Sequence, residues 1–498
     1  MYLNNKLIIG KSDDKELFII PKMANRHGLI TGASGSGKTT TVKVMAETFS
    51  DASIPVFYVD VKGDLASICK EGESSSKIDE RISTLDIKDF KYKAFPTTFF
   101  DVFGKNGHPI RTTVSDIGPR LLSRMLELSD AQEGVLAIIF QIAEDENMKL
   151  NDLGDLKSLV SHVQDNRNEY MNKYGSITTM SISSIQRSLL MLEQEGGVSF
   201  FGKPELQLFD LLQYDMNGNG FINVLSAEEL FKKPTLYAVF LIWLLNTLFD
   251  KMPEVGDLDK PKLVLFLDEA HLIFSEMSNS LIKSIIQVVK LIRSKGVGVY
   301  FISQSPSDIP EEILAQLGNK VQHVLRSYTP SDEKAIKAAA NSFRVNSRFK
   351  TEDAIKSLAT GEALISFLNE NGEPNIVERA MILPPQSFMG TITDSERETV
   401  IKQSRIYMKY ETVNDEESAT EKVAVAKKEK EEKIEADKKA LEDAKLKEQE
   451  AKLKAKEEEK KKKEQDRMMK KITNQVANKV IGKTTTKVVN SLWKNIFK

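Results

Sequence analysis

Short apolar runs alternate along most of the chain with longer segments in which apolar residues recur every three or four positions. The runs have the length and bulky side chains of buried β-strands, and the longer segments have the spacing of amphipathic helices. A strand, a helix and a second strand in this order predict a right-handed crossover between parallel strands. We therefore expect an α/β fold with a mostly parallel sheet. The expected strands are residues 7–10, 17–21, 27–31, 54–60, 220–225, 261–267, 296–303, 317–326 and 361–368. The clearest expected helices are residues 40–49, 121–128, 134–142, 156–163, 182–195, 236–249 and 281–294.

Changes in this pattern divide the chain. Residues 1–24 predict short N-terminal strands ahead of a core at 25–410, and helical spacing dominates between about 65 and 215, which predicts a helical insertion. Residues 411–471 form a tail that is almost wholly Lys, Glu and Ala from residue 421 on, which fits a charged helix or a disordered tail better than a coiled coil. Residues 472–498 form a basic amphipathic segment, which either packs back on its own protein or contacts a membrane surface, nucleic acid or a partner helix.

The loop between the strand at 27–31 and the helix at 40–49 reads Gly-Ala-Ser-Gly-Ser-Gly-Lys-Thr, which matches G-x-x-x-x-G-K-[ST]. Its glycines let backbone N–H groups point inward, and the helix adds the positive end of its dipole; both favour a phosphate. Lys38 is expected to reach the β- and γ-phosphates of a nucleotide, and the hydroxyl of Thr39 to bind Mg²⁺. The expected nucleotide-binding residues are Gly32, Ala33, Ser34, Gly35, Ser36, Gly37, Lys38, Thr39 and Thr40.

Two carboxylates follow the apolar run at 261–267. A strand that is buried on both faces has such an unbroken run of apolar residues. In open parallel sheets, ligands bind in the crevice at the carboxyl ends of the strands. We expect Asp268 and Glu269 to lie there beside the phosphate loop. Asp268 is predicted to hold Mg²⁺ through its water shell, and Glu269 to orient and deprotonate the attacking water.

Polar residues also end three other predicted strands. Asp60 and Lys62 lie on the crevice edge, but a turn formed by Gly63-Asp64 explains the same residues equally well. Gln304 is placed to sense the γ-phosphate or the water. Arg326 ends the strand at 317–326, where an arginine stabilises transition-state charge if a neighbouring subunit supplies it; a surface ion pair is the alternative.

Composition narrows the class of protein. Of 498 residues, 41% are hydrophobic and 29% are charged. The 70 Lys and Arg residues are balanced by 72 Asp and Glu residues, so the chain has no overall positive charge that would indicate nucleic-acid binding. A single cysteine excludes an internal disulfide or a cysteine-rich zinc site and fits a reducing cytoplasm. The start resembles no signal peptide, and the apolar segment at 236–249 is too short to span a bilayer. We expect a cytoplasmic protein without an integral membrane segment.

The ordered motifs resemble the HerA/FtsK group of P-loop ATPases, and within it the HerA-like bacterial proteins of the YjgR type. The similarity covers residues 5–410 and rests on segments 24–30, 60–64, 104–111, 266–271, 293–298 and 361–364, together with the phosphate loop. It implies a RecA-like (ASCE) sheet with a helical insertion, and a homo-hexameric ring with ATP and Mg²⁺ at subunit interfaces. It also implies that Lys38, Glu269, Gln304 and Arg326 serve catalysis, with Gln304 as sensor and Arg326 offered to the neighbouring subunit.

Two functions of different classes follow from this resemblance. The first is an Mg²⁺-dependent ATP hydrolase that works as a ring motor on double-stranded DNA. The second is an ATP-gated scaffold whose charged tail recruits a protein partner, because the N-terminal strands are too few for the separate barrel that HerA uses to dock a nuclease. A DEAH-box helicase, suggested by residues 268–271, is disfavoured because only one ATPase core is evident.

Overall fold

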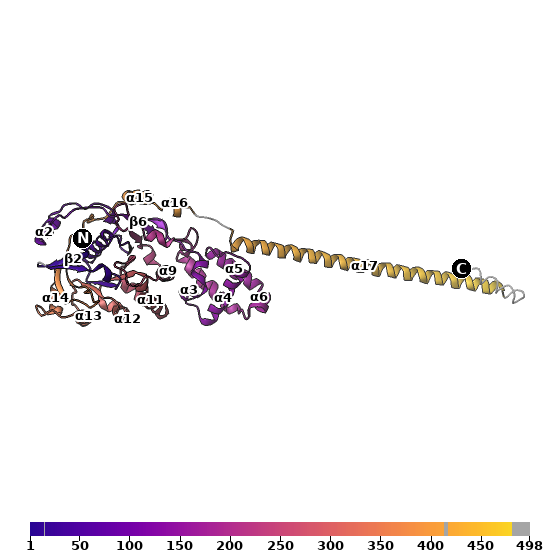
Figure 1. Ribbon diagram of the computed structural model, residues 1–498. Helices are drawn as coiled ribbons and strands as arrows, with labels where there is room; N and C mark the ends of the chain where they lie inside the picture. Colours follow the sequence, from indigo (N-terminus) through magenta and orange to yellow (C-terminus); the bar gives the residue numbers. More distant parts are fainter. Residues whose placement is uncertain (14, 413–416, 481–498) are drawn as a thin grey trace. The chain divides into compact units, whose positions relative to one another are not determined.

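The computed structural model describes residues 1–13, 15–412 and 417–480. The chain divides into two compact units, Met1–Lys422 and Val423–Lys498. Figure 1 shows the first unit as a sheet flanked by helices and the second as the long helix α17 (Ala419–Val480). Most of the basic amphipathic segment expected at 472–498 lies outside the described residues, because only 472–480 are placed, at the end of α17.

One sheet of thirteen strands organises the first unit. Its strand order is β1-β2-β13-β12-β11-β4-β10-β9-β5-β8-β6-β7, with β3 paired to β2. The strands are β1 (Tyr2–Leu3), β2 (Lys6–Ser12), β3 (Lys15–Ile19), β4 (Gly28–Thr31), β5 (Val56–Asp60), β6 (Thr97–Asp101), β7 (His108–Pro109), β8 (Ile222–Ser226), β9 (Leu263–Leu267), β10 (Val297–Ser303), β11 (Asn319–Gln322), β12 (Glu362–Ser366) and β13 (Glu378–Ile382).

The sheet has a parallel part and an antiparallel part. From β11 through β4, β10, β9, β5, β8 and β6 to β7, neighbouring strands run parallel. On the other side of β11, the strands β12, β13, β2 and β3 pair in antiparallel fashion. The N-terminal strands, expected as a separate element at 1–24, therefore belong to the same sheet as the core.

Helices lie between many of the strands and after the last one. They are α1 (Lys38–Asp51), α2 (Ser76–Thr84), α3 (Val114–Met125), α4 (Asp130–Asp145), α5 (Leu153–Asp165), α6 (Arg167–Tyr174), α7 (Thr179–Gln194), α8 (Gly197–Phe200), α9 (Pro234–Lys251), α10 (Ala270–Glu276), α11 (Asn279–Leu291), α12 (Glu311–Leu314), α13 (Pro330–Asn341), α14 (Thr351–Ser357), α15 (Asp394–Gln403) and α16 (Tyr407–Tyr410). Short 3₁₀ helices are η1 (Pro21–Met23), η2 (Ala66–Cys69), η3 (Leu208–Leu211), η4 (Leu230–Lys232), η5 (Ile292–Lys295) and η6 (Pro306–Asp308).

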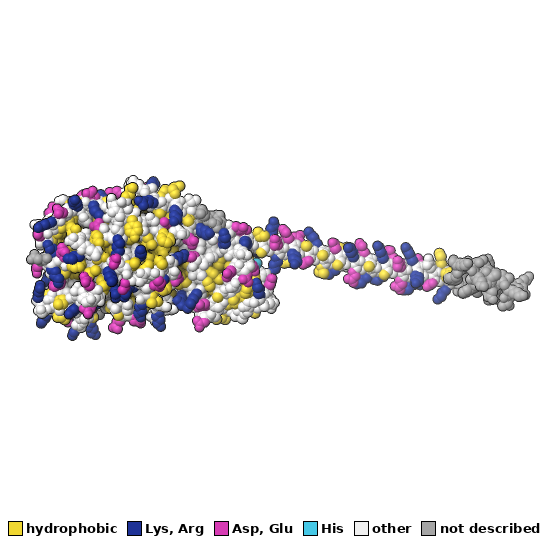
Figure 2. All heavy atoms as spheres, in the orientation of Figure 1, with side chains coloured by type: hydrophobic (Ala, Val, Ile, Leu, Met, Phe, Trp, Pro, Cys, Tyr) yellow, Lys and Arg dark blue, Asp and Glu magenta, His cyan; other side chains and the backbone are white. Residues whose placement is uncertain are grey.

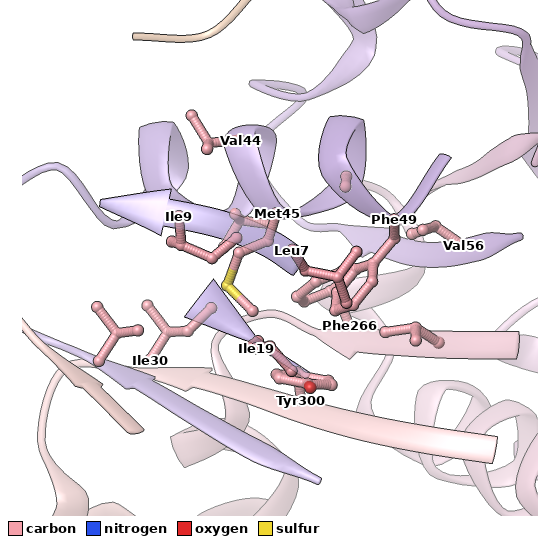
Figure 3. Packing of buried hydrophobic residues seen from close by; sticks show 14 of the residues in the cluster. Leu7, Ile9, Ile19, Ile30, Val44, Met45, Phe49, Val56, Phe266 and Tyr300 are labelled. Atoms are coloured by element: carbon pink, nitrogen blue, oxygen red, sulfur yellow. The ribbon is translucent and has the colours of Figure 1, made fainter. Parts of the chain in front are cut away.

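The main hydrophobic core lies between α1 and one face of the sheet. Met45 and Phe49 of α1 pack into a cluster with Phe266 of β9 and Tyr300 of β10, and all four side chains are buried (Figure 3). The Phe266 ring lies 6.0 Å from that of Phe49 and 5.3 Å from that of Tyr300, measured between centroids. Because side chains alternate across a strand, the intervening residues of β9 face the opposite side of the sheet. Both faces are buried along β9, as the unbroken apolar run predicts.

Three predictions about single elements need correction. Residues 97–101 form β6, a strand of the sheet, within the region expected to be a helical insertion; the helices α3 to α8 begin only at Val114. The strand expected at 317–326 ends at Gln322, because Val324 and Leu325 leave the sheet to pack with α13 and α14. The last strand is β13, which the sequence analysis missed, and not the one at 361–368.

The start of α17 is fixed to the first unit. Thr420 Oγ1 donates a hydrogen bond to Asp155 Oδ1 at 2.8 Å, and Lys422 Nζ donates one to the carbonyl of Asn147 at 2.7 Å. The first unit therefore extends to residue 422, beyond the boundary expected at 410. A deletion that begins at 411 removes these contacts as well as the tail.

Beyond residue 422, α17 is a helix of opposite charges with few apolar side chains, as Figure 2 shows along its length. Lys–Glu pairs four residues apart recur along it, for example Glu448 with Lys452 at 2.7 Å and Glu459 with Lys463 at 2.6 Å. Each such pair stabilises a helix by about 0.2–0.5 kcal/mol. Of the two alternatives for the tail, the helix is the one observed. Within the described residues, no helix combines the length and hydropathy required to cross a membrane.

His27 joins the start of β4 to two neighbouring elements. Its Nδ1 accepts a hydrogen bond from the N–H of Val299 at 3.0 Å, so the ring proton lies on Nε2, which contacts the carbonyl of Val289 at 3.0 Å. The side chain is buried, and this burial lowers the pKa of His27 to about 4. The imidazole is therefore neutral at pH 7.

We expect the stability advantage of the wild type over His27→Gln to shrink as the pH falls. The unfolded chain takes up a proton near pH 6.5, whereas folded His27 does so only near pH 4, so protonation favours unfolding between these values. Between pH 7.5 and pH 5 the advantage should fall by about 2 kcal/mol. Urea unfolding of both proteins at each pH measures it. A difference that does not change with pH contradicts a neutral buried imidazole.

Candidate nucleotide site

The sheet order brings the phosphate loop and the acidic pair to the same edge. Strand β10 lies between β4, which leads into the loop, and β9, which leads into the acids. In the parallel register Ser303 pairs with Thr31, and Phe301 pairs with Leu267. The carboxyl ends of all three strands therefore meet at one edge of the sheet, as the sequence predicts.

The phosphate loop has the backbone shape that its glycines allow. Gly32, Gly35 and Gly37 have φ angles of 155°, 72° and 108°. A Cβ on Gly35 meets no heavy atom within 4 Å, so the loop is open to ligand there, whereas one on Gly32 meets Cβ of His323 at 2.5 Å. The side-chain oxygen of Ser36 is buried and has no hydrogen-bond partner among the described residues.

Lys38, the first residue of α1, folds over this loop. Its Nζ donates hydrogen bonds to the carbonyls of Gly32 at 2.6 Å and Ala33 at 3.1 Å. Burial lowers the pKa of Lys38, and the negative charges of Glu269 and Asp268 act against this lowering. The structure thus brings the lysine and both carboxylates close together, although they are far apart in sequence.

Asp268 is held in a fixed orientation at the end of β9. Its Oδ1 accepts a hydrogen bond from the N–H of Glu269 at 2.8 Å, and its Oδ2 accepts one from the hydroxyl of Tyr58 at 3.2 Å. Burial raises the pKa of Asp268 to about 6, and the charge of Glu269 adds to the effect. A cation bound here would offset both causes.

Glu269 has an unusual backbone and two cationic or titratable neighbours. Its φ of 48° and ψ of 46° lie in the left-handed region at the start of α10, which is uncommon for a residue with a side chain. Its Oε1 forms an ion pair with Nζ of Lys62, and its Oε2 lies 3.2 Å from Nδ1 of His271. That last pair lacks hydrogen-bond geometry, so Oε2 has no hydrogen-bond donor within the described residues.

Residues 60–64 were expected either to form a turn or to line the site, and the structure shows a different residue in each place. Asp60 forms the turn: its carboxylate accepts hydrogen bonds from the N–H groups of Gly63 at 2.8 Å and Leu65 at 3.0 Å. Burial raises the pKa of Asp60 to about 7. Lys62 reaches into the crevice instead, where it contacts Glu269.

Gln304 and Arg326 are less closely tied to the site. Gln304 follows β10 directly, level with Gly32 in the register, and its side chain is exposed at the crevice edge. Arg326 is exposed four residues beyond the end of β11 and forms no ion pair within the described part of the chain. The roles of sensor and of arginine offered to a neighbour remain predictions.

Sequence reasoning missed His323, which lies next to the phosphate loop and contacts the helix that follows it. Nε2 of His323, just after β11, lies 2.8 Å from the hydroxyl of Thr41 in α1, and Nδ1 lies 2.9 Å from the carbonyl of Glu362 in β12. Burial lowers the pKa of His323 to about 4, so the ring is neutral. A polar Gln322-His323 pair at the end of a strand beside the loop was the available signal.

The chemistry of these residues fits a magnesium-bound nucleoside triphosphate. The open glycine loop, the unpartnered hydroxyl of Ser36 and the ammonium of Lys38 suit phosphate oxygens. Thr39 and Asp268 offer the oxygen ligands that Mg²⁺ prefers. When bound, the metal neutralises charge on the phosphates.

Comparison with known proteins identifies the family of the chain. A family model described as "Helicase HerA-like C-terminal" matches residues 5–497. The DNA double-strand break repair helicase HerA of Sulfurisphaera tokodaii is 24% identical over 405 residues, which are 78% of this chain and 70% of that protein. HerA of Sulfolobus acidocaldarius is 21% identical over 411 residues, with the same coverage of 78% and 70%.

Solved structures show the same fold. The bacterial conjugative coupling protein TrwBdeltaN70 aligns with a TM-score of 0.51 at 14% identity, over 77% of this chain and 92% of that one. Plasmid coupling protein TrwB in complex with ADP and Mg²⁺ aligns with a TM-score of 0.51 at 15% identity, over 76% and 88%. The predicted RecA-like α/β fold is confirmed.

Proposed function

Because the chain belongs to the helicase HerA-like C-terminal family, we propose that it is an Mg²⁺-dependent ATP hydrolase that acts as a hexameric ring on double-stranded DNA. The observation that carries the ATPase part is the convergence of Lys38 with Asp268 and Glu269 at one sheet edge. Phosphate loops alone occur in many binding proteins, whereas a loop lysine next to a metal-binding aspartate and a glutamate supplies the parts of a hydrolase.

In this proposal each residue has one task. Backbone N–H groups of residues 32–39 and the ammonium of Lys38 bind the phosphates, and Thr39 and Asp268 hold the metal. Glu269, with one carboxylate oxygen free of hydrogen-bond donors among the described residues, accepts the proton of the attacking water. Gln304 orients that water or senses the terminal phosphate, and Arg326 acts on the nucleotide of a neighbouring subunit.

The proposed DNA substrate rests on the relatives, and the proposed ring rests on the resemblance stated for the sequence. Two of them carry the name DNA double-strand break repair helicase HerA. The opposing candidate is an ATP-gated scaffold that acts on a protein partner. The charged helix beyond residue 422 favours it, because its exposed Lys and Glu side chains up to residue 475 offer many ion pairs to another protein.

The rate of ATP hydrolysis with and without duplex DNA separates the two functions. We expect duplex DNA to stimulate the full chain severalfold, and a chain of residues 1–422 equally, since the proposed motor lies in the first unit. The cut at 422 keeps the contacts of Thr420 and Lys422. The mass of the particle in ATP should correspond to six chains.

The variant Lys38→Ala is the control for contaminating ATPases, and it should hydrolyse no ATP above background. Two results together favour the scaffold. Duplex DNA leaves the hydrolysis rate of the full chain unchanged, and deletion of residues 423–498 abolishes binding of a protein partner. Hydrolysis that survives Lys38→Ala contradicts the assignment of the site.

A further inference from the structure

In the ion pair between Lys62 and Glu269, the lysine side chain is much more exposed than the glutamate side chain. The side chain of Glu269 is 7% exposed at the end of a central strand, and that of Lys62 is 50% exposed. Lysine has a flexible stem and three N–H donors, whereas a buried carboxylate has few alternatives. Lys62 is therefore the partner able to exchange one anion for another.

A rigid turn aims Lys62 at the crevice. The carboxylate of Asp60 accepts hydrogen bonds from the N–H groups of Lys62 at 3.3 Å and Gly63 at 2.8 Å, so the backbone on both sides of the lysine Cα is fixed to the end of β5. Gly63 has a φ of 77°, which favours glycine at this turn. Only the stem of Lys62 remains free to move.

The ammonium of Lys62 lies near that of Lys38. The charge of Lys62 contributes to the lowered pKa of Lys38, after burial, and the negative charge of Glu269 acts on both ammonium groups. Burial acts to lower the pKa of Lys62 itself, but the hydrogen bond and charge of Glu269 outweigh it and the net shift is upward. One cation thus pairs with the carboxylate of Glu269, and a second, on the phosphate loop, lies within the range of its charge.

From this arrangement, and resting on the proposed function, we propose that Lys62 is a second cationic ligand of the terminal phosphate of ATP, which it binds in exchange for Glu269. The γ-phosphate carries more negative charge than one carboxylate and lies within the reach of a residue beside Lys38 and Glu269. The exchange frees the carboxylate of Glu269 for the attacking water at the moment when a triphosphate is bound. ADP lacks the group that draws Lys62 away.

The affinity of Lys62→Met for a non-hydrolysable ATP analogue and for ADP, both with Mg²⁺, tests this inference in the full chain. Loss of one charged hydrogen bond should weaken analogue binding about tenfold. Binding of ADP should change less than twofold. Lys105→Met is the matched control, since Lys105 also follows a strand of the parallel part and pairs with Glu229 at 2.7 Å outside the crevice.

A second comparison excludes an indirect effect through Glu269. If Lys62 only neutralised this carboxylate, Lys62→Met would not alter nucleotide selectivity in a Glu269→Gln background. We expect the tenfold loss for the analogue to persist there. The inference is overturned if Lys62→Met weakens the binding of both nucleotides equally, so that the ratio of the two affinities is unchanged. It is also overturned if the effect disappears in the Glu269→Gln background.

Failure of the underlying function gives a different result. Lys38→Ala should bind neither nucleotide, and if it binds both as the wild type does, the phosphate site itself is misassigned. A defective Lys38→Ala beside an unaffected Lys62→Met overturns only the role of Lys62.

Discussion

Glu269→Gln is expected to lower the rate of ATP hydrolysis by about 10²–10⁴-fold, the range for loss of a general base. The amide keeps the size of the side chain but accepts a proton poorly. Asp268 retains its hydrogen bonds from the N–H of residue 269 and from Tyr58, so the metal ligand keeps its orientation. Binding of an ATP analogue should remain within a few fold of the wild type. Steady-state hydrolysis and equilibrium binding measure the two effects.

The matched control for this substitution is Glu312→Gln, which changes an exposed carboxylate that pairs with Lys290 on the surface. Its hydrolysis rate should equal that of the wild type. Turnover by Glu269→Gln at more than a tenth of the wild-type rate contradicts the role of general base. Loss of analogue binding together with turnover indicates instead that the left-handed backbone at residue 269 tolerates no change.

Phe266→Ala is expected to destabilise the first unit by about 3–5 kcal/mol, as large-to-small changes of buried aromatic residues do. The ring is fully buried and packs against Phe49 and Tyr300 (Figure 3). Phe266 lies two residues before Asp268, so the lost packing is close to the acidic strand end. Urea unfolding of the chain of residues 1–422 measures the loss.

Phe209→Ala provides the comparison, because Phe209 is 78% exposed, and its effect should stay below about 0.5 kcal/mol. A loss below about 1 kcal/mol for Phe266→Ala shows that the core collapses around the missing ring. Hydrolysis by the folded fraction should also decrease, since β9 carries both carboxylates.

The meeting of the phosphate loop and the acidic pair at one sheet edge was predictable because both are local motifs at strand ends. The phosphate loop is recognisable from its spacing, and the unbroken apolar run before Asp268 marks a central strand. General rules for parallel sheets then bring the two together. The strand between them, β10, was also expected, which is why Gln304 lies at the predicted edge.

Elements that depend on tertiary partners escaped prediction. Strand β13 begins with Glu378 and Arg379, and these charged residues are not typical of a buried strand. They form ion pairs with Lys15 and Glu362 respectively. Strand β6 carried a signal in its Thr-Thr-Phe-Phe run, but its helical surroundings obscured it. The contact of Lys62 with Glu269 depends on side-chain rotamers at the ends of two strands, which spacing along the chain does not encode.

The position of β4 has a consequence for biosynthesis. Its two neighbours, β10 and β11, begin at Val297 and Asn319, so the ribosome releases β4, the strand that leads into the phosphate loop, long before either pairing partner. Contacts this distant in sequence fold slowly, and an apolar strand waiting for its partners is prone to aggregate. A nascent chain shorter than about residue 323 therefore exposes the apolar strand β4 without its flanking partners. Chaperone occupancy during translation should peak over that interval and fall once β11 has emerged.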